Sequence, residues 1–181
     1  DVHGCYRSLV ALMKKCPKNR EFCFVGDLID RGPSSRDVVE LVKSAGHHCV
    51  MGNHELYMVR WYEHGNTELG TLIADSWFPH GGLMTMSSYD TEDEFNEHAD
   101  WLKDLPYVLK FENFEKPLIV THAAMDVPFE EAKTADSVLW NRNAPPVTEE
   151  YYNVFGHTPQ EVPDIQGHYA NLDTGLCYGK T

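Results

Sequence analysis

Five short polar motifs, each typical of the carboxyl end of a strand, constrain this chain more than any other feature. They are Asp1-Val-His3-Gly4, Gly26-Asp27-Leu-Ile-Asp30-Arg31-Gly32, Gly52-Asn53-His54-Glu55, Thr121-His122-Ala123 and Phe155-Gly156-His157-Thr158. In open α/β sheets, functional residues gather where strands end. Glycine allows sharp turns and a close approach of the backbone to a ligand, so glycines beside these polar residues predict one shared site.

The residue types in the motifs indicate a metal centre. Asp, His and Asn supply oxygen and nitrogen donors without a thiolate, a set that suits Mn, Fe, Zn or Mg better than a structural zinc site. Asp1 and His3 are one residue apart, so both point the same way on an extended segment. Asp27 is the candidate carboxylate to bridge two ions about 3.5–4 Å apart. Alone, each motif could be a structural histidine, a turn or an ion pair, but their joint occurrence favours metal binding.

Hydrophobic patterning predicts an α/β fold in one domain over residues 1–181. Helices are expected at residues 6–15, 35–44 and 56–62, and strands at 21–25, 48–51, 107–111, 118–121, 153–155 and 169–172. The order of the first elements, strand then helix, is typical of an α/β sheet. Residues 63–105 carry several glycines and aromatics, then an amphipathic helix near 91–102 that Thr91 and Glu94 would cap. This segment is predicted to be a helical insertion over the sheet.

Composition narrows the classes of partner. The formal net charge is -13, which argues against non-specific binding of nucleic acid or of an anionic membrane surface. A phosphate ligand would therefore need local positive charge from bound cations or a few arginines. The five cysteines are odd in number and show no C-x-x-C spacing, which favours a reducing compartment and a cytoplasmic location. No pattern indicates a particular oligomeric state.

The motifs together resemble the signature set of the phosphoprotein phosphatase family, within the calcineurin-like metallophosphoesterases. Asp1-Val-His-Gly-Cys-Tyr6 and Trp140-Asn-Arg142 are most similar to the bacterial and phage lambda-type Ser/Thr/Tyr protein phosphatases. The resemblance implies a β-sandwich of mixed sheets flanked by helices. It also implies hydrolysis of phosphomonoesters, on phosphorylated proteins or small phosphoesters, by a hydroxide that bridges two divalent metal ions. Mn is the expected metal, with Fe, Zn and Ni as alternatives.

The resemblance also implies a role for each motif residue. The first metal would be held by Asp1, His3 and Asp27, and the second by Asp27, Asn53, His122 and His157. His54 would be the general acid, oriented by Asp30. The phosphate oxygens would be bound by Arg31 and Arg142, with Asn53 beside them. Glu55 and Trp77 are expected to have structural roles, and Trp140 to help seat Arg142.

Other interpretations of the motifs remain open. A symmetrical dinucleoside tetraphosphate hydrolase has the same metal cage and a stretch like Arg31-Gly-Pro33, but Asp30 and Trp140-Asn-Arg142 favour the phosphatase. A non-catalytic binding module is the alternative from another class, and the filled catalytic positions argue against it. The family normally has a strand before Asp1 and another after Asp173-Thr-Gly175, so the chain resembles a catalytic core clipped at both ends.

Overall fold

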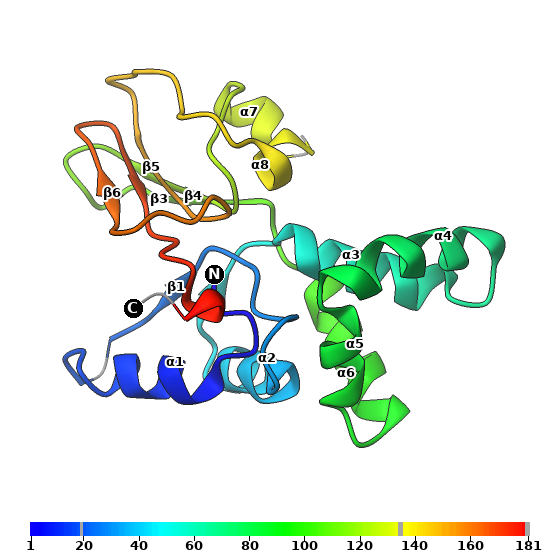
Figure 1. Ribbon diagram of the computed structural model, residues 1–181. Coiled ribbons are helices and arrows are strands. Elements are labelled where there is room, and N and C mark those ends of the chain that lie inside the picture. The colour runs from blue at the N-terminus through cyan, green and yellow to red at the C-terminus, as the bar shows by residue number, and fades with distance from the viewer. Residues whose placement is uncertain (19, 134–135, 180–181) are drawn as a thin grey trace.

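Two β-sheets pack face to face, and helices cover their outer sides (Figure 1). The computed structural model describes residues 1–18, 20–133 and 136–179. The smaller sheet pairs β1 (Cys23–Phe24) with β2 (His48–Cys49) in parallel. The larger sheet has the order β3-β4-β5-β7-β6. Its strands are β3 (Val108–Phe111), β4 (Leu118–Thr121), β5 (Tyr152–Phe155), β6 (Asp164–Ile165) and β7 (Tyr169–Asn171).

The central strands of the larger sheet point in the same direction. β4, β5 and β7 are parallel, whereas β3 and β6 run antiparallel at the two edges. The carboxyl ends of β4 and β5 therefore meet at one edge of the sheet, where the chain continues into His122 and His157. A layer of branched side chains joins the two sheets, with Val25 and Val50 packed against Val120.

The helices form three groups. α1 (Tyr6–Met13) and α2 (Ser35–Ser44) lie below the smaller sheet in Figure 1, and α7 (Phe129–Ala132) and α8 (Ser137–Trp140) lie beside the larger one. A third group projects to one side: α3 (Asn53–His64), α4 (Glu68–Trp77), the 3-10 turn η1 (Phe78–His80), α5 (Gly82–Ser87) and α6 (Glu92–Lys103). A second 3-10 turn, η2 (Leu176–Tyr178), follows the last strand. In the described part of the chain, no helix is both long and apolar enough to cross a membrane.

The observed elements confirm the predicted α/β class and differ from the sequence analysis mainly in their bounds. α2 and β4 have the predicted ends, and the side chain of Thr91 caps α6 by accepting from the Glu94 amide. α3 starts at Asn53 rather than at residue 56, because the ligand motif itself forms the first helical turn. α4 and α5 lie inside the predicted helical insertion, and the sequence analysis did not resolve them as separate helices.

A buried carboxylate fixes the loop after β1 to the start of α3. Glu55 is fully buried and accepts main-chain hydrogen bonds from Asp27 (2.7 Å), Leu28 (2.8 Å) and Ile29 (3.3 Å). It also accepts from the amide of Gly52, at 3.0 Å. Turns that leave main-chain donors buried need such an acceptor, because an unpaired amide away from water is costly. The expected structural role of Glu55 agrees with these contacts.

We expect Glu55→Gln to lower the free energy of unfolding by about 3 kcal/mol, because the new amide group would face main-chain donors with a donor of its own. Urea unfolding of the metal-stripped protein, followed by circular dichroism, measures the change. Glu115→Gln is the matched control, since Glu115 is exposed, and it should stay within about 0.5 kcal/mol of the parent. Equal stability of the two variants would show that Glu55 does not hold the loop.

Candidate metal centre and active site

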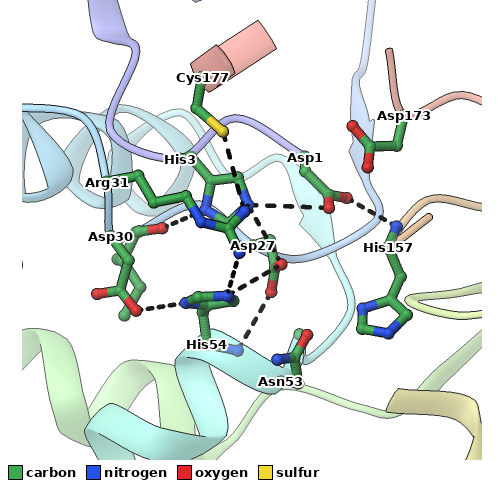
Figure 2. A network of polar contacts seen from close by, with 12 residues as sticks. Asp1, His3, Asp27, Asp30, Arg31, Asn53, His54, His157, Asp173 and Cys177 are labelled. Carbon is green, nitrogen blue, oxygen red and sulfur yellow. Dashed lines mark hydrogen bonds and ion pairs between the residues drawn. The ribbon is translucent and has the colours of Figure 1, made fainter. Parts of the chain in front are cut away.

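The structure brings the predicted site residues together around one cavity of about 140 Å³. Its lining includes Asp1, Asp27, Arg31, Asn53, His54, Arg142 and His157. The remaining predicted residues, His3, Asp30 and His122, lie directly behind this lining and contact it. They arrive from the N-terminal segment, the loop after β1, the first turn of α3 and the loops after β4 and β5 (Figure 2).

Left-handed backbone conformations are concentrated at this site. In the described part of the chain, the non-glycine residues with positive φ are His3 (47°), Asp27 (49°), Asp30 (72°), Arg31 (65°) and His157 (67°), all of them predicted site residues. Such conformations are disfavoured for residues with a Cβ and persist where the surrounding structure enforces them. The fold therefore accepts backbone strain to bring these side chains together at the cavity and directly behind its lining.

One group of ligand atoms surrounds the side chain of His122. The Nδ1–H of His122 donates to the carbonyl oxygen of Val25, which leaves a lone pair on Nε2. That nitrogen lies 3.4 Å from Asp27 Oδ1, 2.8 Å from Asn53 Oδ1 and 3.1 Å from His157 Nδ1. Burial lowers the pKa of His122, so its ring is neutral. Oxygen and nitrogen ligand atoms thus converge on one point, an arrangement that a bound cation satisfies.

A second group of ligand atoms surrounds His3. Its Nδ1–H donates to the Ile29 carbonyl oxygen at 2.8 Å, so its Nε2 also presents a lone pair. This Nε2 lies 3.4 Å from Asp27 Oδ2 and 3.9 Å from Asp1 Oδ2. Burial lowers the pKa of His3 to about 3, against the opposing charge of Asp27. Asp27 therefore turns one oxygen to each group, and both groups have the donor types that suit divalent ions.

His54 differs from these ligands because it is paired with a carboxylate. Its Nδ1 bonds to Asp30 Oδ2 at 2.5 Å, and its Nε2 lies near the cavity, 3.1 Å from an Nη atom of Arg31. Burial opposes protonation, but the charge of Asp27 and the hydrogen bond to Asp30 outweigh it and raise the pKa of His54. The site therefore combines neutral ligand histidines with one histidine that favours its protonated form.

Two arginines supply the positive charge at the cavity. Arg31 contacts the imidazole nitrogens of His3 and His54, and its guanidinium lies 5.2 Å from the ring centroid of Tyr178. Arg142 donates to the carbonyl oxygen of His157 at 3.4 Å. Because guanidinium groups bind phosphate oxygens in a bidentate manner, the pair gives this acidic protein a local anion site.

Several residues that contribute to the site were not among the predicted site residues. Trp77 is fully buried and donates its indole N–H to Asp30 Oδ2 at 2.8 Å, and Thr85 donates to Asp30 Oδ1 at 2.5 Å. Tyr57 and Tyr178 line the cavity. Trp140 also lines it, with its ring edge-on to Tyr57 (5.7 Å between centroids) and to His157 (6.2 Å). The suggestion that Trp140 seats Arg142 remains a prediction.

Comparison with solved structures supports the fold. The crystal structure of a candidate diadenosine tetraphosphatase superposes with a TM-score of 0.72 at 22% sequence identity, over 98% of this chain and 82% of that one. At this identity the likeness establishes a shared architecture, which is the mixed sheet flanked by helices described above.

Comparison of sequences establishes the family. The chain is 28% identical to the asymmetrical bis(5'-nucleosyl)-tetraphosphatase PrpE of Halalkalibacterium halodurans, over 99% of this chain and 84% of the relative. It is also 28% identical to serine/threonine-protein phosphatase 2 of Salmonella typhimurium, over 99% of this chain and 87% of that protein. The model of the calcineurin-like phosphoesterases matches residues 1–161, which include every motif of the metal centre. The chain therefore belongs to the calcineurin-like phosphoesterases, a family of metal-dependent hydrolases of phosphate esters.

Proposed function

We propose that this protein is a metal-dependent phosphoprotein phosphatase that hydrolyses phosphomonoesters of serine and threonine, and of tyrosine. One observation carries the proposal: the hydrogen-bonded pair of His54 and Asp30 lies beside Asp27, at the edge of a cavity with two arginines. This arrangement offers a proton donor, a metal-binding carboxylate and a phosphate site within one small space. The five cysteines are free, which agrees with function in a reducing compartment such as the cytoplasm.

Two divalent ions, Mn first among the candidates, would be held by the two groups that share Asp27. Asp1 and His3 would complete the first site, and the second would take Asn53, His122 and His157. When bound, the ions would neutralise phosphate charge and supply an activated water as nucleophile. The ligand atoms of His54 also lie within 4.8 Å of those of His3 and Asp27. However, His54 is paired with Asp30 and its pKa is raised, and a protonated imidazole does not bind a metal ion, so Asp1 would take this place in the first site.

The remaining residues would act on the ester itself. Arg31 and Arg142 would bind the phosphate oxygens and hold the phosphorus atom in line for attack. His54 would donate the proton on Nε2 to the leaving oxygen as the ester bond breaks. Asp30 would hold the ring in position and keep it protonated, and Trp77 and Thr85 would fix both oxygens of Asp30.

Hydrolysis of dinucleoside tetraphosphates is the second candidate function. Two comparisons favour it, because the PrpE relative and the superposed crystal structure carry such names. The cavity adds support through Tyr57, Trp140 and Tyr178, on which a nucleobase could stack. Asp30 and Trp140-Asn-Arg142 support the phosphatase, as argued from the sequence.

A substrate panel on metal-stripped protein, with Mn added back, decides between the two functions. We expect Mn-dependent release of phosphate from a phosphoserine peptide, a phosphotyrosine peptide and an aryl phosphate, each with a higher kcat/KM than a dinucleoside tetraphosphate. A preference for the tetraphosphate would replace the phosphatase proposal with the second candidate. Absence of metal-dependent turnover of every substrate would refute both and leave a binding module.

Replacing His54 tests the proton donor. We expect His54→Asn to lower kcat by about 10²–10⁴-fold, the usual contribution of general acid catalysis, with the metal content unchanged. Metal content is read by mass spectrometry of the desalted protein. His48→Asn is the control, because His48 is exposed, and it should keep the parent activity. If His54→Asn loses metal along with activity, His54 is a ligand and not the acid.

Replacing Asp27 tests the shared carboxylate. Because Asp27 faces both ligand groups, Asp27→Asn should reduce the content of both metals together, whereas loss of His122 alone should affect one of them. Titration of metal-stripped variants with Mn, followed by calorimetry, measures the number of sites. The control variant Asp93→Asn, at an exposed position of α6, should bind Mn with the same number of sites and the same affinity as the parent. One remaining site of full affinity in Asp27→Asn would exclude the bridging role.

A further inference from the structure

A second cavity, of about 560 Å³, lies among α3, α5 and α6. None of its lining residues takes part in the metal centre. Small-molecule sites in proteins usually enclose about 300–1,000 Å³, so this volume is sufficient for a metabolite or a side chain of a ligand. The apolar part of its wall consists of Trp61, Tyr62, Met86, Tyr89 and Phe95.

The aromatic rings of this wall are held in place by one another. Phe95 is buried and packs edge-on against Trp61 (5.8 Å between centroids) and Tyr89 (5.3 Å). The hydroxyl group of Tyr89 is also hydrogen-bonded to His98 at 3.0 Å. A wall of rings with fixed positions can receive a ligand at a low cost in conformational entropy.

All charged residues that line this cavity are acidic. Asp90 and Glu92 lie at its exposed rim, and the lining includes no lysine or arginine. Arg36, which reaches toward α6, is already paired with Asp37 (3.1 Å) and with Glu94 (2.6 Å). An anion, such as a phosphate ester, therefore meets no cationic side chain in this lining. Carboxylates beside aromatic rings are instead the surroundings that organic cations prefer, through cation–π attraction and charge pairing.

A short series of contacts joins this cavity to the active site. The ring of Trp61 lies 6.0 Å from the ring of Trp77, centroid to centroid. Trp77 is fully buried and donates its N–H to the same oxygen of Asp30 that holds His54. Trp61 is half-buried, with one side at the cavity, whereas Trp77 is surrounded by close-packed side chains, so an occupant that presses Trp61 toward Trp77 displaces that ring as well.

We propose that the cavity is a second ligand site, specific for a small organic cation, and that its occupant acts through Trp61 and Trp77 on the Asp30–His54 pair. The ligand's ammonium group lies near Asp90 and Glu92, and its apolar part contacts the aromatic wall. The binding half of the inference is independent of the proposed function. The regulatory half rests on the proposed function, because it is measured as a change in the rate of ester hydrolysis, in which His54 would be the general acid.

Binding is tested by nuclear magnetic resonance on the ¹⁵N-labelled protein loaded with zinc, which is diamagnetic and does not broaden nearby resonances as Mn does. Choline is the probe, and its uncharged carbon isostere, 3,3-dimethylbutan-1-ol, is the matched control compound. We expect choline to shift the indole N–H resonance of Trp61, assigned with Trp61→Phe, in a saturable manner, and the isostere to bind at least about fivefold more weakly. The double variant Asp90→Asn/Glu92→Gln should lower the affinity for choline by a similar factor, whereas Asp93→Asn should leave this affinity unchanged.

The regulatory half is tested by steady-state kinetics with a phosphomonoester that the protein hydrolyses. Saturating choline should change kcat with little change in KM, and the uncharged isostere should leave kcat unaffected at the same concentration. Lack of a saturable shift, or equal affinity for choline and for the isostere, would refute the proposed ligand site. Saturation without a change in kcat would overturn the link to His54. If no ester is hydrolysed, the proposed function fails while the binding result stands.

Discussion

The carboxylate of Asp27 is the group on which the rest of the site depends, because both ligand groups use it. Its main-chain amide is held by Glu55, and one of its oxygens accepts from the amide of His54 at 3.2 Å. The first turn of α3 therefore performs three tasks with consecutive residues. Asn53 joins the ligands, His54 faces the cavity, and Glu55 fixes the loop that carries Asp27.

Among the described residues, left-handed backbone at non-glycine positions is confined to this small region. The core elsewhere follows local preference, with branched residues such as Val38, Val39 and Val42 on the buried face of α2. At the site, by contrast, buried histidines and carboxylates lie close together on left-handed backbone. Proteins that are locally consistent tend to depart from that consistency where they bind or react, and the departure here coincides with the metal centre.

The sequence predicted that four candidate ligands lie close together because each follows a strand, and Asp27, Asn53 and His157 also follow a glycine, which are local features. Asp27, Asn53, His122 and His157 could therefore be placed at one edge before any coordinates existed. Trp77 and Thr85 could not be found in this way. They reach Asp30 from 47 and 55 residues away through the packing of the helical insertion, which follows no short motif.

The class of phosphate ester that the protein hydrolyses could not be predicted from the sequence either, for a different reason. The chain is 28% identical both to a relative named as a tetraphosphatase and to one named as a protein phosphatase, so overall similarity does not separate the two activities. The residues beside the predicted ligands are the other source of selectivity. Tyr57 and Tyr178 lie far apart in the sequence and line one cavity only in the folded protein.

The predicted metal ligands are supplied from both sheets, and this has a consequence for the life of the protein in a cell. Asp27 and Asn53 follow strands of the smaller sheet, and His122 and His157 follow strands of the larger one. An ion bound among them ties the two layers together, so metal loading and folding become thermodynamically linked. The newly made chain is thus most exposed to proteases before it has acquired its metals. Metal supply would then set how much of the protein survives, as well as how active each molecule is.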